Sequence, residues 1–330
     1  MKSATDNSTL APVVTDDLPE NLDRPLAGIG FIVLGMTCIS VNDMLIKVLS
    51  DRYALHQIIF IRSLVAIAIS FAIVRLEGGL GILRTTRPGL HAVRGLLLVI
   101  ANMTFFLGLA AMPLAEATAI FFVAPLFITL FSIPLLGERV GARRLAAVAV
   151  GFIGVLIMMR PGGGAGRPDL VIYLLPVVAA LTYALFQILT RKLGAINKAS
   201  AMAVYTQGVF IVVGLAFFGI AGDGRFAPEL DNPSLVFLLR AWVMPSAGDM
   251  AILASLGLIS GALAYSLSRA YRLASAATIA PFEYVLLPLA ALWGLIVFGE
   301  VPDLRAAAGM TLIVGSGVYV FLRTRSGAKS

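Results

Sequence analysis

The chain has 330 residues, of which 59% are hydrophobic and only 13% are charged. Soluble domains carry about 25% charged residues, so this composition excludes an ordinary globular protein. The net charge of +7 comes from basic residues spread over short loops, which argues against a nucleic-acid-binding protein with one basic face.

Apolar stretches of about 20 residues recur along the chain, and each could cross roughly 30 Å of hydrocarbon as a helix. A single cysteine, Cys38, excludes an internal disulfide and a cysteine-based metal site. Two histidines, His56 and His91, are too few for a His-rich metal site. We therefore predict an all-α integral membrane protein with no metal and no cofactor.

The first 25 residues are polar and rich in Asp and Glu. A secretory signal needs a basic start followed by an apolar run, and this segment has neither. We expect residues 1–25 to form a disordered tail on the cytoplasmic side, with the first spanning helix beginning near Leu26.

Apolar length and loop signals predict ten membrane-spanning helices, five in each half of the chain. The first five are Leu26–Leu49, Ala54–Val74, Gly89–Ala110, Leu114–Leu136 and Ala142–Met159. The second five are Asp169–Thr190, Ala199–Ala221, Asp249–Tyr271, Ala274–Phe298 and Asp303–Leu322. The long connector Gly222–Gly248 contains the sequence NPSLVFLLRAW, which predicts a short interfacial helix with Trp242 at headgroup depth.

The distribution of Lys and Arg predicts the orientation. With the N-terminus inside, 16 of the 25 basic residues fall on inside segments, six on outside segments and three within spans. Cytoplasmic loops of membrane proteins carry the excess of positive charge. We therefore expect a multi-pass protein of the bacterial inner membrane with both termini in the cytoplasm.

An internal repeat links the two halves. The segments Ala124–Leu156 and Leu286–Val320 both run from an apolar helix with an early proline to a Gly-Glu pair, a short turn and a glycine-bearing helix. The pairs Gly137-Glu138 and Gly299-Glu300 are 162 residues apart. Five helices per half is an odd number, so repeats 26–160 and 168–323 are expected to be inverted. Inverted five-helix halves are a hallmark of secondary transporters, whose substrate site lies between the halves.

These motifs resemble the drug/metabolite transporter superfamily, specifically its EamA type. The resemblance rests on the two helices that end in Gly-Glu and on the segments Arg269–Tyr284 and Ala180–Leu193, and it covers Leu26 to Arg325. It implies that helices one to four and six to nine surround a central cavity, with five and ten as outer braces. Bacterial relatives of this type include exporters of aromatic amino acids and other metabolites, and uptake carriers for vitamins or nucleosides.

Glu283 is the strongest candidate site residue. It lies nine residues after Ala274, about 13 Å along a helix and thus close to the membrane midplane. A charge there costs about 2.5–3.5 kcal/mol on insertion scales, so it normally faces water or a partner. Pro281 opens backbone polarity at the same depth. We expect Glu283 to bind a substrate ammonium or carry a coupling proton; pairing with an Arg or hydroxyl to hold helices together is the alternative.

The first span carries Asn42, Asp43 and Lys47. The i,i+4 spacing of Asp43 and Lys47 allows an ion pair on one helix face, which would either contribute to binding or simply order the end of the helix. Asn42 is expected to face the cavity. In the sixth span, Tyr183 and Gln187 share a face that suits a substrate with a ring and polar ends, although the same pair could join helices by hydrogen bonds.

Arg62 lies in the second span and needs an acidic partner, Asp43 or Glu283, or a water-filled space; it could also hold a substrate carboxylate. Arg94, about one turn from the cytoplasmic end, is expected to extend its charge to that surface. The remaining cavity candidates are Asn102, Tyr265 and Trp293, the last of which could equally be an interfacial anchor.

Prolines and glycines predict where helices break and where they pack closely. The prolines of the fourth and ninth spans predict breaks in these paired helices, which are candidates for moving or binding elements; they are Pro125, Pro134, Pro281 and Pro288. The glycines of the fifth and tenth spans predict close helix packing; they are Gly151, Gly154, Gly309, Gly315 and Gly317.

Together these features predict a secondary transporter of small amphipathic metabolites that works by alternating access, with export of amino acids, aromatic ones included, as the leading hypothesis. An uptake carrier for vitamins or nucleosides on the same fold is the alternative, and a passive channel is the alternative from another class. No converging acid, base and nucleophile supports an enzyme. We expect a small-molecule substrate and the lipid bilayer as partners, no nucleic acid, and a monomer.

Overall fold

The computed structural model describes residues 24–137, 140–159, 170–194, 198–227, 231–274 and 280–327, and within these ranges every regular element is helical. The first part contains α1 (Pro25–Leu49), α2 (Leu55–Glu77), η1 (Leu80–Leu83), α3 (Pro88–Ala111), α4 (Leu114–Phe121), α5 (Ala124–Leu136) and α6 (Ala142–Met159). The second part contains α7 (Leu170–Gly194), α8 (Ala199–Ala221), α9 (Pro233–Leu239), α10 (Ala247–Leu273), η2 (Ala280–Val285), α12 (Leu286–Phe298) and α13 (Leu304–Gly327).

In the described part of the chain, seven helices are long and apolar enough to cross a membrane, and three shorter apolar helices accompany them. Large apolar side chains remain exposed along their outer faces, as lipid contact requires. The prediction of an all-α integral membrane protein is therefore confirmed. Of the expected N-terminal tail, residues 1–23 lie outside the described part.

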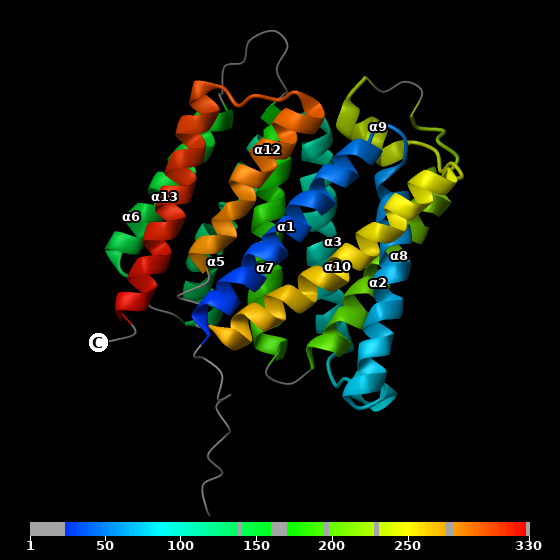
Figure 1. Cartoon of the computed structure of the whole chain (residues 1–330), viewed down its shortest axis with the longest axis horizontal. Coiled ribbons are helices and arrows are strands. Elements are labelled where there is room, and N and C mark those ends of the chain that lie inside the picture. Colours follow the sequence, from blue (N-terminus) through cyan, green and yellow to red (C-terminus); the bar gives the residue numbers. More distant parts are fainter. Residues whose placement is uncertain are drawn as a thin grey trace, which may run out of the picture.

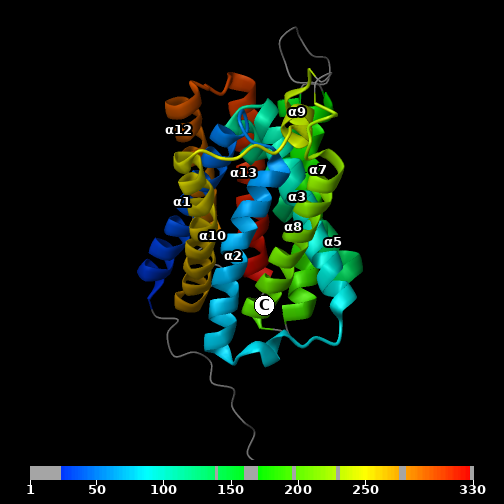
Figure 2. The same ribbon diagram turned by 90° about the vertical axis from the view of Figure 1, so that its right-hand side faces the viewer.

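The helices form an upright bundle of neighbouring pairs (Figure 1). α1 packs along α10, α2 along α8, α3 along α7, and α6 along α13. The pair α6–α13 lies at one edge of the bundle, on the left in Figure 1. α1 begins and α13 ends at the lower end of the bundle in this view, whereas α9 and the link from α12 to α13 lie at the upper end (Figures 1 and 2).

Two predicted continuous spans are interrupted in the structure. α4 ends at Phe121 and α5 begins at Ala124, because Pro125 has no N–H to donate to the carbonyl of Phe121. The expected helix Ala274–Phe298 is not continuous either: Ala280–Val285 is a 3₁₀ turn, and the α-helix begins only at Leu286. The breaks predicted from the prolines are thus confirmed near Pro125 and Pro281, whereas Pro134 lies inside α5 and Pro288 in the first turn of α12 without ending either helix.

Close packing holds α6 against α13, as the glycines predict. A Cβ on Gly154 would lie 2.8 Å from the carbonyl oxygen of Gly309, and a Cβ on Gly309 would lie 2.7 Å from that of Gly154. Gly317 leaves room for the hydroxyl of Tyr284, whereas Gly315 faces open space and is not a packing point. Lipid tails provide no hydrophobic driving force between helices, so the helices associate through close van der Waals packing. Small residues allow the helix backbones to approach closely enough for such packing.

The predicted short helix in the long connector is α9. Asn232 caps its start, since the side-chain oxygen accepts from the backbone N–H groups of Ser234 at 3.0 Å and Leu235 at 3.3 Å. Trp242 then folds back onto the bundle, with its ring 4.5 Å from that of Phe218 and 5.7 Å from that of His56. The connector therefore packs against the ends of α2 and α8.

Candidate functional site

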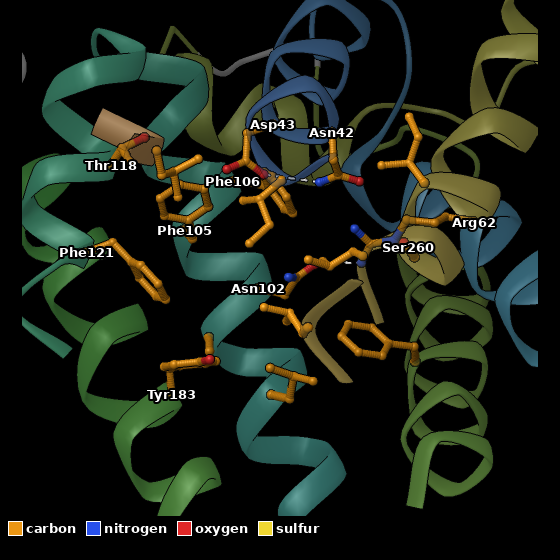
Figure 3. A pocket seen from close by; sticks show the side chains of 18 of the residues that line it. Asn42, Asp43, Arg62, Asn102, Phe105, Phe106, Thr118, Phe121, Tyr183 and Ser260 are labelled. Carbon is orange, nitrogen blue, oxygen red and sulfur yellow. Dashed lines mark hydrogen bonds between the residues drawn. The ribbon is translucent and has the colours of Figure 1, made fainter. Parts of the chain in front are cut away.

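A cavity of about 340 Å³ lies in the middle of the bundle (Figure 3). Its lining residues come from α1, α2, α3, α4, α7, α8, α10 and α12. Among the described residues, none from α6 or α13 lines it, which agrees with the bracing role that the family resemblance implies for the fifth and tenth helices. The size suits a small metabolite.

Two neighbouring residues of α1 place hydrogen-bond acceptors in this cavity. Asp43 is 6% exposed, and its carboxylate accepts from Asn42 Nδ2 at 3.1 Å. Asp43 takes part in none of the ion pairs between described residues. The side-chain oxygen of Asn42 is buried and has no hydrogen-bond partner among the described residues. A buried carboxylate and an unpaired carbonyl side by side can receive the N–H groups of a cationic ligand.

A guanidinium enters the same cavity from α2. Arg62 is 9% exposed and donates from Nη2 to Asn102 Oδ1 on α3 at 2.8 Å. Its guanidinium carbon lies 6.0 Å from the ring centre of Phe106 and 5.8 Å from that of Phe210. Asn102 uses one of the five N–H donors of the side chain. The planar group, fixed by one amide and two rings, can present its other donors to a ligand carboxylate.

The opposite wall of the cavity is aromatic. Phe105 on α3 contacts Phe121 on α4 with ring centres 5.2 Å apart, and Phe121 contacts Tyr183 on α7 at 5.3 Å. Figure 3 shows Phe121 and Tyr183 on the other side of the cavity from Arg62, with Asn42 and Asp43 above them. Such rings pack edge-to-face on one another and on a bound ring. The cavity therefore has a charged side and an aromatic side.

Five of the residues predicted from sequence line the cavity: Asn42, Asp43, Arg62, Asn102 and Tyr183. The structure places the other four candidates elsewhere. Gln187 donates to the hydroxyl of Tyr183 at 3.0 Å, so it helps to fix the position of that lining residue. Trp293 on α12 donates to Ser40 Oγ on α1 at 3.2 Å and joins these two helices. Tyr265 is 59% exposed and meets the ring of Phe31 on the outer face of α1 and α10.

Glu283 is half-buried in η2 and is not among the lining residues of the cavity. It lies close enough to Tyr183 and Tyr284 to act on both electrostatically. The depth expected for it assumed a continuous helix from Ala274, and the 3₁₀ turn around Pro281 does not provide that geometry. The carboxylate that lines the cavity belongs to Asp43.

Two expectations about basic side chains need correction. Lys47 does not pair with Asp43; its Nζ lies 2.5 Å from Glu300 Oε1 and donates to the carbonyl oxygen of Met112 at 2.7 Å. Arg94 does not extend to the surface, because it is 3% exposed and donates to the carbonyl oxygen of Met202 at 2.6 Å and to Thr206 Oγ1 at 2.7 Å. Arg94 also donates to Thr190 Oγ1 on α7 at 3.3 Å, and it therefore ties α3 to both α7 and α8.

Sequence reasoning missed the aromatic wall, since phenylalanines in a spanning helix look like lipid-facing residues. One signal was available on α3, where Asn102, Phe105 and Phe106 follow the i, i+3, i+4 spacing of a single helix face. Once Asn102 is taken as a cavity residue, both phenylalanines should face the same space. Gln207 and Ser260, which also line the cavity, carry no such signal.

Comparison with known proteins identifies relatives of this chain. Residues 26–160 match the EamA-like transporter family. The S-adenosylmethionine uptake transporter of Rickettsia prowazekii is 26% identical over 92% of this chain and 96% of its own. The riboflavin transporter of Rhizobium johnstonii is 30% identical over 73% of each chain, and the pseudopaline exporter of Pseudomonas aeruginosa is 27% identical over 93% of this chain and 99% of its own.

A solved crystal structure shares the fold, with a TM-score of 0.58 at 20% identity over 91% of this chain and 98% of that one. The family match, the relatives along most of the chain and the central cavity agree with one another. The chain therefore belongs to the EamA-like transporter family, a branch of the drug/metabolite transporters.

Proposed function

We propose that this protein is a secondary transporter that moves small amphipathic metabolites across the bacterial inner membrane by alternating access. The observation that carries the proposal is the central cavity, which places a carboxylate and a guanidinium inside a bundle of apolar helices. Charged groups at such positions are costly unless they serve a ligand or a pathway. The transporters named among the relatives support the same class.

The proposed architecture has ten crossings in two inverted halves, 26–160 and 168–323, with both termini in the cytoplasm. The helix pairs support it: exchanging the halves turns the α1–α10 contact into the α7–α3 contact and leaves α2–α8 and α6–α13 unchanged. The paired motifs support it too, since Gly137 ends α5 at a φ of +71° and Gly299 ends α12 at +67°. A site between such halves can open to either side in turn.

We propose a substrate that carries an amino-acid group and a ring. Asp43 and the free oxygen of Asn42 would receive the ammonium, and Arg62 would receive the carboxylate. The row Phe105, Phe121 and Tyr183 would pack on the ring. Aromatic amino acids have both features, and export of amino acids is the direction proposed. Glu283, beside Tyr183, is the proposed proton-coupling group.

The substrates in the names of the relatives suggest two candidate substrate classes, compounds with an amino-acid group and a ring, and vitamins with a ring alone. S-adenosylmethionine carries an amino-acid group and an adenine ring, so it could use both sides of the cavity. Riboflavin has a large flat ring but no amino-acid group, so it would use the aromatic side alone. The aromatic wall is the observation that keeps uptake of a vitamin as the second candidate function.

Counterflow in proteoliposomes tests the proposal. Vesicles loaded with unlabelled tryptophan, S-adenosylmethionine or riboflavin should transiently accumulate the same labelled compound, and the rate should saturate with concentration. A passive channel would give a linear flux without accumulation. Absence of accumulation for every amino-acid compound, with accumulation of riboflavin, would replace the amino-acid proposal by vitamin transport.

A further inference from the structure

The Gly299-Glu300 pair is a sequence motif that the central cavity does not use. Gly299 ends α12 in the left-handed conformation, with φ of +67°, where a side chain would be strained. The backbone N–H of Glu300 then donates to the carbonyl of Gly294 at 2.9 Å. This turn folds the carboxylate back onto α12, where a Cβ on Gly294 would lie 3.4 Å from Oε2. The motif therefore fixes the position of one carboxylate.

That carboxylate joins three elements. Its Oε1 lies 2.5 Å from Lys47 Nζ near the end of α1, and its Oε2 accepts from the backbone N–H of Leu114 at 2.8 Å. Leu114 is the first residue of α4, whose opening N–H groups have no partner within the helix. Lys47 also donates to the carbonyl of Met112 in the α3–α4 link. Lys47 and Glu300 thus hold α1, α4 and the end of α12 together.

The pair lines a second cavity, one helical turn along α1 from the central one. This second cavity, of about 600 Å³ at the upper end, is lined by Lys47 and Glu300 and by Asp51 and Glu116. On α1, Asp43 of the central cavity lies one turn below Lys47. Ile46, next to Lys47 on α1, and Leu114, which binds Glu300, are each at most 1% exposed. The Lys47 and Glu300 side chains are 10% and 21% exposed, respectively.

We propose that the Lys47–Glu300 pair is a latch that closes the upper end of the central cavity, and that this end opens when the pair separates. This inference rests on the proposed transport function. A half-buried ion pair suits a reversible closure, because water hydrates both charges when they part and so offsets much of the lost attraction. A purely apolar contact would expose apolar surface to water on opening, and no favourable interaction would offset that free-energy cost.

The latch also gives the binding site a mechanical link to the closure. Asp43 and Lys47 are one turn apart on α1, so a ligand held by Asp43 and the partner of Lys47 act on the same helix segment. On the α4 side, Thr118 lines the central cavity one turn from Leu114, which binds Glu300. Movement of either helix at the ligand therefore moves one side of the latch.

Thiol labelling tests the latch without any substrate. In a Cys38→Ser background, Ser260→Cys places one thiol in the central cavity with little change of shape. A membrane-impermeant thiol reagent is applied to spheroplasts and, separately, to inverted vesicles. Glu300→Gln should raise labelling from the face that carries the α1–α2 link at least 10-fold. Asp51→Asn, which removes a carboxylate from the same upper cavity, should leave labelling unchanged.

A pair of cysteines covers the case in which Glu300→Gln does not fold. Lys47→Cys and Glu300→Cys are combined with Ser260→Cys, and a short cleavable bifunctional thiol reagent first joins positions 47 and 300. This cross-link should block labelling of the cavity thiol at position 260 from the upper face. A reductant that cleaves the cross-link should restore the labelling. Equal labelling in Glu300→Gln and Asp51→Asn, or full labelling of the cross-linked protein, would overturn the latch. Neither readout depends on counterflow, so failure of the transport proposal would be seen separately.

Discussion

The two parts of the chain, 24–159 and 170–327, enclose the central cavity together but bring different chemistry to it. The first part supplies both charged lining residues, Asp43 and Arg62, and the amides of Asn42 and Asn102. The second part supplies neutral polar groups, among them Tyr183, Gln207 and Ser260. Helices from both parts of the chain thus build the walls of the cavity, whereas both charged lining residues come from the first part.

This difference separates two tasks. In the proposed architecture, helices that pair with one another under exchange of the halves would let the bundle open at either end. The two charged residues, Asp43 on α1 and Arg62 on α2, are instead proposed to orient the substrate. Binding free energy should therefore be concentrated on the first part, and substitutions in the second part should matter less. The predictions below measure this asymmetry.

The largest effect is expected from Asp43→Asn, which keeps the shape of the side chain but removes its charge. Loss of a charge-assisted hydrogen bond costs about 1.5–3 kcal/mol, so affinity for a zwitterionic substrate should fall roughly 10- to 100-fold. Ser260→Ala, which changes a neutral lining residue from the second part of the chain, should change affinity less than about 3-fold. Calorimetry on the purified protein measures both, and equal losses would remove the asymmetry.

Arg62→Lys should have the next largest effect. Lysine keeps the positive charge but lacks the planar fork that can hold a carboxylate and the amide of Asn102 together. We expect a loss of about 10-fold for an amino acid and no loss for the corresponding decarboxylated amine. Competition binding with tryptophan and tryptamine separates the two. A parallel loss for both compounds would show that Arg62 supports the cavity and does not bind the carboxylate.

Phe121→Leu tests the aromatic wall with a smaller expected effect. The ring contacts Phe105 and Tyr183, and an aromatic pair adds about 0.5–1.5 kcal/mol beyond the area it buries. Affinity for ring-bearing compounds should fall about 2- to 10-fold, while that for a zwitterion with an aliphatic side chain should hardly change. The ratio of the two affinities is the quantity to measure, and a constant ratio would exclude a role for this ring in selectivity.

Most of the architecture could be predicted from the sequence because each span is long, apolar and bounded by loop residues. The bounds of α6 and α8 match the prediction, and the glycines of α6 and α13 meet where close packing was expected. Proline positions also predicted the break between α4 and α5. These features depend on local composition and on neighbours along the chain, which a sequence displays directly.

The pairing of buried polar groups could not be predicted in the same way. Spacing along α1 allowed an ion pair between Asp43 and Lys47, but the lysine pairs with Glu300, which lies 253 residues away in the sequence. Arg94 similarly finds its partners on α7 and α8. Such partners are decided by which helices pack together, and helix packing depends on contacts between segments far apart in sequence.

Glu283→Gln should have the smallest effect on binding, because Glu283 lies outside the lining of the cavity. We expect affinity to stay within about 2-fold of the wild type, since no hydrogen bond to the ligand is removed. The proposed role of Glu283 as a proton carrier predicts a different loss: transport driven by a pH gradient should stop, while counterflow without a gradient should continue. A pH-sensitive dye inside the vesicles measures the proton movement. If Asp43→Asn stops proton movement and Glu283→Gln does not, the charged side of the cavity carries the proton as well as the ligand.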